Sequence, residues 1–285
     1  MTTPGFDLHL PDRLTTSVVF SSPHSGRNYP VSFLDQSVLD AHQIRSSEDA
    51  FIDRIFRPAT DCGAPLLAAR VPRAYVDLNR GADELDPAVI EGVRRNGHNP
   101  RVASGLGVIP RVVANGRAIY RGKLPLAEAK SRLDRYWFPY HEALQQQLDR
   151  AHQAFGEAIL IDCHSMPREA VDCVVRSGAR RPDVVLGDRF GASAAAPVVD
   201  EIEAILTRAG LTVARNAPFA GAFVTQQYGR PSRRQHAVQL EIDRSLYMDE
   251  ARIRPRDDFD AFRDLIAAAI AEMTEIGRAL PLAAE

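Results

Sequence analysis

Ala158-Ile159-Leu160-Ile161-Asp162-Cys163-His164-Ser165-Met166 is a short apolar run that ends in a histidine flanked by polar residues. The earlier stretch Thr16-Ser17-Val18-Val19-Phe20-Ser21-Ser22-Pro23-His24-Ser25-Gly26 has the same arrangement. Both runs are typical of buried strands, and each places a His-Ser pair where we expect the strand to end. Open α/β sheets bind ligands beyond the carboxyl ends of their strands. Because neutral imidazole is a common zinc ligand, the pair predicts two ligands of one metal ion.

One histidine at the end of a strand is weak evidence of a metal site, because histidines are often partly buried for structural reasons. His24 and His164 together are stronger evidence, since an acidic segment lies between them and a glutamate lies on a later strand. We therefore interpret the pair as functional.

Length and composition indicate a soluble protein. The 285 residues suffice for one sizeable core, and we expect a single domain over residues 1–285. The net charge of −2 gives no reason to expect nucleic acid or a membrane surface as a partner. No run reaches the roughly 18 apolar residues of a membrane span, and the N-terminus has no signal-peptide pattern. Cys62, Cys163 and Cys173 have no CxxC spacing, which disfavours a disulfide framework and fits a reducing cytoplasm.

Strand-like and helical patterns alternate along the chain. This alternation predicts an α/β fold with a mostly parallel sheet covered on both faces. The expected strands are residues 17–20, 65–69, 74–78, 158–161, 183–186, 211–214 and 237–242. The expected helices are residues 47–56 with Ser46 or Ser47 as N-cap, 126–155 with a kink at Pro139, 192–209 ending at Gly210, and 257–276.

A third metal ligand should be an acidic oxygen, because a catalytic zinc ion typically has three protein ligands and one open position for water. Glu48-Asp49 is the expected source. Asp53 lies one turn later in the expected helix, so it could instead ligate the metal or orient a ligand. The alternative interpretation is that these acids only complement the dipole at the helix N-terminus.

Glu241 is the candidate base for the water and the later proton donor to the leaving amine. It lies in Val238-Gln239-Leu240-Glu241-Ile242-Asp243-Arg244, where a carboxylate among apolar residues would be costly to bury without a role. Strand alternation puts Gln239, Glu241 and Asp243 on one face. The alternative is an exposed polar face on an edge strand.

Asn79-Arg80 closes the expected strand 74–78 and suggests an anchor for an acidic substrate. The planar fork of arginine matches a carboxylate with two hydrogen bonds. A structural salt bridge with Asp77 or Asp83 is the alternative. Residues 81–123 are rich in glycine and arginine and fit no element, so we expect an ordered loop over the site. This loop would bring Arg111 and Arg121 to the substrate as further anchors.

Blocks along nearly the whole chain resemble the N-formylglutamate amidohydrolase family, in the same order. They cover residues 18 to 250, and jointly they are specific although several are weak alone. The blocks are Ser22-Pro23-His24-Ser25-Gly26, Glu48-Asp49 with Asp53-Arg54, Tyr75-Val76-Asp77-Leu78-Asn79-Arg80, Gly105-Leu106-Gly107-Val108-Ile109-Pro110-Arg111, Asp162-Cys163-His164-Ser165-Met166, Asn216-Ala217-Pro218-Phe219-Ala220-Gly221, and Gln239-Leu240-Glu241-Ile242-Asp243-Arg244-Ser245-Leu246-Tyr247-Met248.

That family resembles zinc carboxypeptidases and aspartoacylases in fold, which implies a mixed, mostly parallel central sheet flanked by helices on both faces. The resemblance also implies one Zn²⁺ or another divalent ion on His24, Asp49 and His164, a role for Glu241 through the metal-bound water, and carboxylate binding by Asn79 and Arg80. One departure is that no acid follows His24 within a few residues, since Arg27-Asn28-Tyr29 supplies none. Asp49, Glu48 and Asp53 therefore stay open as the third ligand.

The sequence leads to a metal-dependent amidohydrolase acting on an N-acylated acidic amino acid, with N-formyl-L-glutamate as the leading substrate and histidine breakdown as the context. Rivals are a zinc carboxypeptidase or aspartoacylase-like deacylase with another substrate, and a binding protein that has lost catalysis. We expect a cytoplasmic protein with a small-molecule partner, no nucleic acid and no membrane. Whether the protein forms a homo-oligomer is left open.

Overall fold

The computed structural model describes residues 5–94, 99–172 and 180–278, so Cys173 lies outside the described residues. Contacts divide the chain into two compact units. Unit 1 comprises Met1–Asp7, Pro23–Ala50 and Ala68–Ala143, and unit 2 comprises Leu8–Ser22, Phe51–Leu67 and Leu144–Glu285. Within the described residues, no helix is both long and apolar enough to cross a membrane.

Seven strands form the main sheet, in the order β1-β3-β2-β4-β7-β5-β6. β2 pairs with β4, β4 with β7 and β5 with β6 in parallel, whereas β5 pairs with β7 antiparallel. The expected mixed, mostly parallel sheet is therefore confirmed. Its strands are β1 (Phe6–His9), β2 (Val18–Ser22), β3 (Leu66–Ala69), β4 (Ala158–Met166), β5 (Val184–Gly187), β6 (Val213–Arg215) and β7 (Gln235–Asp243), and a separate pair is β8 (Met248–Asp249) with β9 (Arg254–Pro255).

β4 and β7 form the centre of this sheet and pair over their full lengths, from Ala158↔Gln235 to Met166↔Asp243. All residues of β4 are buried, as are all of β7 after Gln235. Apolar runs of this kind are typical of strands covered on both faces. The expected strand 158–161 is too short, because β4 continues through Met166. His164 therefore lies within the strand and not beyond its end.

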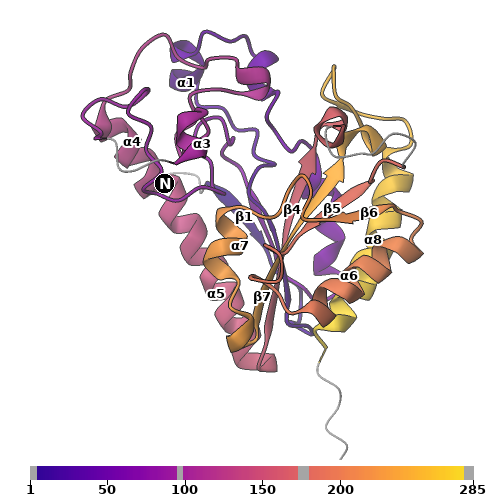
Figure 1. Cartoon of the computed structure of the whole chain (residues 1–285). Helices are drawn as coiled ribbons and strands as arrows, with labels where there is room; N and C mark the ends of the chain where they lie inside the picture. The colour runs from indigo at the N-terminus through magenta and orange to yellow at the C-terminus, as the bar shows by residue number, and fades with distance from the viewer. Residues whose placement is uncertain (1–4, 95–98, 173–179, 279–285) are drawn as a thin grey trace, which may run out of the picture. The chain divides into compact units, whose positions relative to one another are not determined.

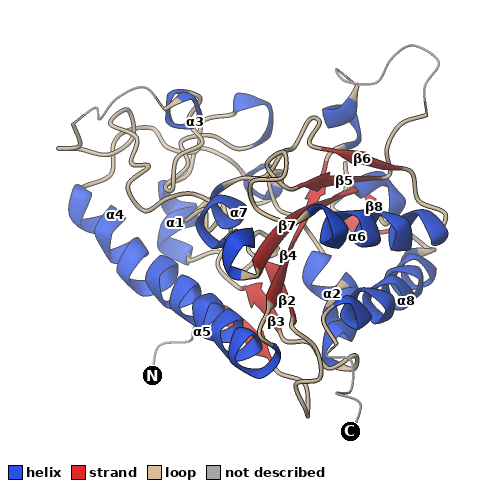
Figure 2. Ribbon diagram, turned by 60° about the horizontal axis from the view of Figure 1, so that its bottom comes forward, coloured by secondary structure: helices blue, strands red, loops and turns tan. Residues whose placement is uncertain are grey.

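The helices of unit 2 cover both faces of its strands. Figures 1 and 2 show α6 (Ala196–Arg208) and α8 (Phe259–Ile276) on one side of β4 and β7, and α7 (Phe223–Tyr228) on the other. α6 ends as expected near Gly210, whose left-handed φ of 88° suits a residue without a side chain. The expected flanking helices are confirmed, with later starts for α6 and α8.

The expected helix 126–155 is continuous in direction but changes type. α4 (Leu126–Arg132) passes through a π-helical segment, η4 (Leu133–Trp137), into α5 (Phe138–Phe155). Pro139 is the second residue of α5. Proline lacks an N–H donor and crowds the carbonyl four residues earlier, which here lies in η4. The interruption expected at Pro139 therefore appears one turn before it.

Two other expectations are wrong. Residues 74–78 form no strand and instead turn after Pro72, whose carbonyl accepts the N–H groups of Tyr75 and Val76. The expected helix 47–56 shrinks to α2 (Ile52–Ile55), because the left-handed φ of 69° at Phe51 interrupts it. Its N-cap is Phe51, not Ser46 or Ser47.

The loop expected over residues 81–123 is ordered where it is described, with fully buried Val108 and Ile109. It contains α3 (Pro100–Ala103) and η3 (Ala114–Gly116). The remaining short elements of the chain are α1 (Val31–Gln36), η1 (Gln43–Arg45), η2 (Arg57–Thr60), η5 (Arg168–Val171), η6 (Pro231–Arg233) and η7 (Arg244–Leu246).

Candidate metal and hydrolytic site

His24 follows β2 by two residues and is 2% exposed. Its Nε2 lies 2.7 Å from Asp77 Oδ1, and its Nδ1 lies 3.4 Å from Asp49 Oδ2. Asp77 also accepts hydrogen bonds from Arg73 and from the N–H of Asn79. Burial opposes ionisation of Asp77, but His24, Arg73 and Arg80 together hold its pKa well below the ordinary value. An ionised Asp77 fixes the proton of His24 on Nε2 and turns Nδ1 toward Asp49.

His164 has matching surroundings on β4. Its Nε2 lies 2.9 Å from Asp162 Oδ2, and Asp162 accepts a weaker hydrogen bond of 3.4 Å from the Ser21 hydroxyl. Both side chains project from the same face of the strand, because they are two residues apart. A carboxylate on the outer imidazole nitrogen is the usual companion of a metal-binding histidine, since it fixes the tautomer and the ring orientation.

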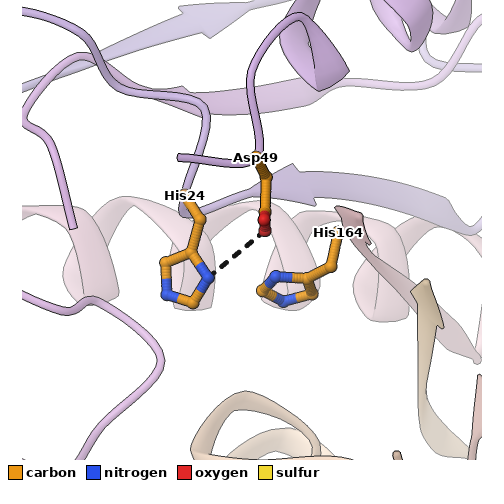
Figure 3. Close-up of side chains that lie close together, drawn as sticks. All are labelled: His24, Asp49 and His164. Carbon is orange, nitrogen blue, oxygen red and sulfur yellow. Dashed lines mark ion pairs between the residues drawn. The ribbon is translucent and has the colours of Figure 1, made fainter. Parts of the chain in front are cut away.

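His24, Asp49 and His164 form a buried group whose potential ligand atoms all lie within 4.8 Å of one another. Figure 3 shows the Asp49 carboxylate and the two imidazole rings close together, with the ion pair to His24 dashed. Two nitrogens and one carboxylate oxygen are a donor set that zinc prefers. Tetrahedral ligands about 2.0–2.1 Å from zinc lie about 3.4 Å apart, which matches the distance between His24 Nδ1 and Asp49 Oδ2. The residues therefore fit a zinc ion.

Glu48 has different partners from Asp49. Its carboxylate accepts two hydrogen bonds of 3.0 Å from Arg45 and one of 2.7 Å from the Tyr29 hydroxyl. Burial and the neighbouring Glu48 raise the pKa of Tyr29, so this phenol keeps its proton. Asp49 lies in an irregular segment, because α2 begins only at Ile52. The alternative that these acids serve a helix dipole is therefore wrong for Glu48 and Asp49.

Arg80 is 9% exposed and bonds to backbone carbonyls. Its Nε donates to Leu106 O at 2.9 Å, and its Nη1 donates to Asn79 O at 2.7 Å. Within the described residues it has no hydrogen bond or ion pair with a carboxylate, so the alternative interpretation, a structural salt bridge with Asp77 or Asp83, is wrong. Burial lowers the pKa of Arg80 from its ordinary value, although Asp77 opposes that shift. A desolvated guanidinium held by carbonyl groups retains the capacity to bind an anion.

Trp137 at the end of η4 and His141 of α5 hold the chain around Asn79 and Arg80. The indole Nε1 of Trp137 donates to Arg80 O at 2.8 Å, and Nε2 of His141 lies 3.0 Å from Leu78 O. Burial lowers the pKa of His141 to about 4, so its ring is neutral at pH 7 and donates from Nε2. No local pattern predicts these contacts, because the partners are 57 and 63 residues apart in the chain.

Arg111 and Arg121 lie in different surroundings from Arg80. Arg111 pairs with Asp86 at 3.0 Å and lines a cavity of about 920 Å³ in unit 1. Arg121 is exposed and lines a smaller cavity of about 260 Å³. Neither cavity is lined by Arg80. The ion pair of Arg111 makes it a weaker candidate for a substrate anchor than Arg80.

Glu241 lies in the middle of the sheet and not on an edge strand. Its partners in register are His164 on β4 and Val185 on β5, and it is 8% exposed. Gln239 Nε2 donates to Glu241 Oε1 at 2.9 Å. The alternative of an exposed polar strand face is therefore wrong.

Sequence reasoning missed several residues that support the site. Asp162 could have been found, since strand alternation places it on the face of His164. Asp77 lies 53 residues from His24, and no spacing rule relates them. Arg244 was also missed: it is 7% exposed and donates to the Ser165 hydroxyl at 3.1 Å.

Comparisons with known proteins agree with this arrangement. Residues 16–248 match the model of the family described as N-formylglutamate amidohydrolase. The chain is 33% identical to an N-formylglutamate deformylase of Pseudomonas aeruginosa and 31% identical to one of Pseudomonas putida, in each case over 82% of both chains. The crystal structure of an N-formylglutamate amidohydrolase from Ralstonia eutropha is 35% identical, with a TM-score of 0.90 over 96% of this chain and 99% of that one.

A gene product of Agrobacterium tumefaciens shares the fold at 17% identity, with a TM-score of 0.63 over 94% of this chain and 95% of that one. Taken with the sheet and the buried residues at its centre, the matches define the chain as a hydrolase that acts on an amide C–N bond. It belongs to the N-formylglutamate amidohydrolase family, which confirms the resemblance in its sequence.

Proposed function

We propose that this protein hydrolyses N-formyl-L-glutamate to formate and L-glutamate with one divalent metal ion, Zn²⁺, held by His24, Asp49 and His164. The observation that carries the metal assignment is the buried convergence of two imidazoles and a carboxylate. The substrate assignment rests on the relatives, which are named N-formylglutamate deformylases. A late step of histidine breakdown is the corresponding context.

A zinc ion, when bound, polarises the amide carbonyl and lowers the pKa of a coordinated water towards about 7. Glu241 takes one proton from the attacking water, whose oxygen forms the new bond to the formyl carbon. Glu241 then gives this proton to the amide nitrogen as the C–N bond breaks, so that glutamate leaves as the amine. Its place beside His164 in the register of the sheet supports both proton transfers.

Arg80 binds a substrate carboxylate in this proposal, with Asn79 beside it. The guanidinium is buried, it has no hydrogen bond or ion pair with a carboxylate within the described residues, and backbone carbonyls hold it in place. Arg111 or Arg121 stays a proposed second anchor. The partner is therefore a small acidic N-acyl amino acid.

Two measurements test the proposal. Metal analysis of the purified protein should find about one zinc ion per chain, and replacement of His164 should remove it. A panel of N-formyl, N-acetyl and N-succinyl amino acids should give the highest kcat/KM for N-formyl-L-glutamate. A preference for another acyl group would keep the hydrolase but overturn the substrate, and a metal-loaded protein with no turnover on the panel would favour a binding protein.

Glu241→Gln should keep the zinc ion and lose turnover by about 10²–10⁴-fold, because an amide cannot accept the water proton. Metal content and kcat should be measured on the same preparation. Near-normal turnover would remove Glu241 from the mechanism.

A further inference from the structure

We propose that Gln239 is a positioning residue that holds Oε1 of Glu241 as a hydrogen-bond acceptor and thereby assigns proton transfer to Oε2. The inference rests on the proposed role of Glu241 as the base. It concerns a buried side chain that lies two residues from Glu241 on the same face of β7. Gln239 is 4% exposed, and its Nε2 lies 2.9 Å from Glu241 Oε1.

The orientation of the Gln239 amide follows from its other partner. Gln239 Oε1 accepts a hydrogen bond of 3.1 Å from the backbone N–H of Ala222. A backbone N–H can only donate, so the oxygen of the amide must face Ala222 and the NH₂ group must face Glu241. Glu241 Oε1 must then be an acceptor. A proton that Glu241 takes from water therefore resides on Oε2.

The segment that carries Ala222 is fixed against the sheet. A Cβ atom on Gly187 would lie 2.6 Å from Gly221 N and 2.7 Å from the carbonyl carbon of Ala220, so this segment crosses β5 in direct contact. Gly187 pairs with Gln239 in the register of the sheet, which places the crossing beside Gln239. Ala222 O accepts hydrogen bonds from Gln226 N and from the Thr225 hydroxyl at the start of α7.

Phe219 of the same segment packs against a buried cluster formed by Met166, Val171 and Val185. Val185 is the register partner of Glu241, and Met166 lies two residues after His164 on the same face of β4. The Gln239 amide links the backbone of this segment to the Glu241 carboxylate. This link keeps the carboxylate in one rotamer during two opposite proton transfers.

Gln239→Glu is the most specific variant, because the two side chains are nearly isosteric. An ionised glutamate can still accept the hydrogen bond from Ala222 N, but it cannot donate one to Glu241. Gln239→Leu removes both hydrogen bonds at similar volume. Each variant should lower kcat by about 10–100-fold, the usual worth of a hydrogen bond to a charged group, with a much smaller change in KM. Zinc content should stay at the wild-type value.

Gln235→Leu is the matched control. Gln235 lies on the same face of β7 and donates to Tyr228 O at the end of α7, but it is six residues from Glu241 in the chain sequence. This variant disturbs the contact between β7 and α7 without touching the Glu241 carboxylate. It should keep kcat within about twofold of wild type. The decrease in its melting temperature measures how much the loss of one hydrogen bond between β7 and α7 destabilises the fold.

A double-mutant cycle with Glu241→Gln decides whether Gln239 acts through Glu241. If it does, Gln239→Glu should cost almost nothing further in kcat once Glu241 is replaced. Equal losses in both backgrounds, or wild-type kcat in both Gln239 variants while Glu241→Gln is inactive, would overturn this inference alone. Near-normal turnover of Glu241→Gln would overturn the proposed mechanism and this inference with it.

Discussion

Each histidine of the metal group places Nε2 on an aspartate, His24 on Asp77 and His164 on Asp162. A neutral imidazole that donates from Nε2 keeps its lone pair on Nδ1. The two rings are therefore prepared for a cation before it arrives, and little rearrangement should accompany its binding. The two aspartates also bring negative charge into a buried region, which a divalent ion would offset.

Arg80→Ala should lower kcat/KM far more for N-formylglutamate than for a neutral N-formyl amino acid. Loss of a desolvated arginine–carboxylate pair costs roughly 2–5 kcal/mol, much of it from the substrate charge left without a partner. A neutral formyl amino acid with the same backbone, assayed on wild type and variant, serves as the control. Equal losses for both substrates would mean that Arg80 only supports the fold of unit 1.

Elements with long apolar runs could be predicted from the sequence, whereas the conformation of residues 74–78 in unit 1 could not. Residues 74–78 alternate in polarity like a strand, and Ala74, Val76 and Leu78 are indeed buried. Asp77 is buried as well, because His24 and Arg73 satisfy its carboxylate. The alternating apolar residues therefore predicted which side chains are buried, but not the backbone conformation. A buried turn after Pro72 can bury the same apolar positions as a strand.

The residue types of the site were predictable, but their supporting contacts were not. The donor chemistry that zinc prefers predicts His24, His164 and one acid among Glu48, Asp49 and Asp53, and the structure groups Asp49 with the two histidines. Whether Glu48 or Asp49 joins them depends on Arg45 and Tyr29, which occupy Glu48 through tertiary contacts. Such contacts leave no periodicity in the sequence. The single-domain expectation over the whole chain stays a prediction, as do zinc occupancy and the oligomeric state.

The segment that carries His24 depends on a glycine. A Cβ atom on Gly26 would lie 2.0 Å from Val71 O and 2.5 Å from its carbonyl carbon. Asn28 N also donates to Arg70 O at 2.9 Å, so the two backbones are in contact over several residues. Gly26→Ala should push this segment away, cost about 1–3 kcal/mol of unfolding free energy and weaken zinc binding through His24.

Gly122→Ala is the control for this substitution, because among the described residues, its two chain neighbours apart, no heavy atom lies within 4 Å of the position of its Cβ. Thermal unfolding and zinc titration of the two variants should be compared under the same conditions. A Gly26→Ala protein that matches Gly122→Ala in both measurements would show that the segment moves without cost.

Acid stability is a property of the whole molecule to which His141 contributes a defined part. Burial lowers its pKa from about 6.5 to about 4, against the opposing effect of the hydrogen bond to Leu78 O. The folded chain therefore keeps His141 neutral at pH values where the unfolded chain protonates it. Unfolding takes up this proton between about pH 6.5 and 4, so stability falls as the pH falls through that window.

His141→Gln should flatten this part of the pH dependence, because glutamine can donate to Leu78 O but does not titrate. A shift of this size corresponds to about 3 kcal/mol, which the wild type should lose between pH 7 and pH 4 in excess of the variant. Denaturant unfolding of both proteins in EDTA at several pH values measures the difference without a contribution from metal release. The two proteins differ only at residue 141, so contributions from every other residue cancel in the comparison. Parallel curves would show that His141 takes up its proton without unfolding the chain, and that the contact between α5 and Leu78 tolerates a charged ring.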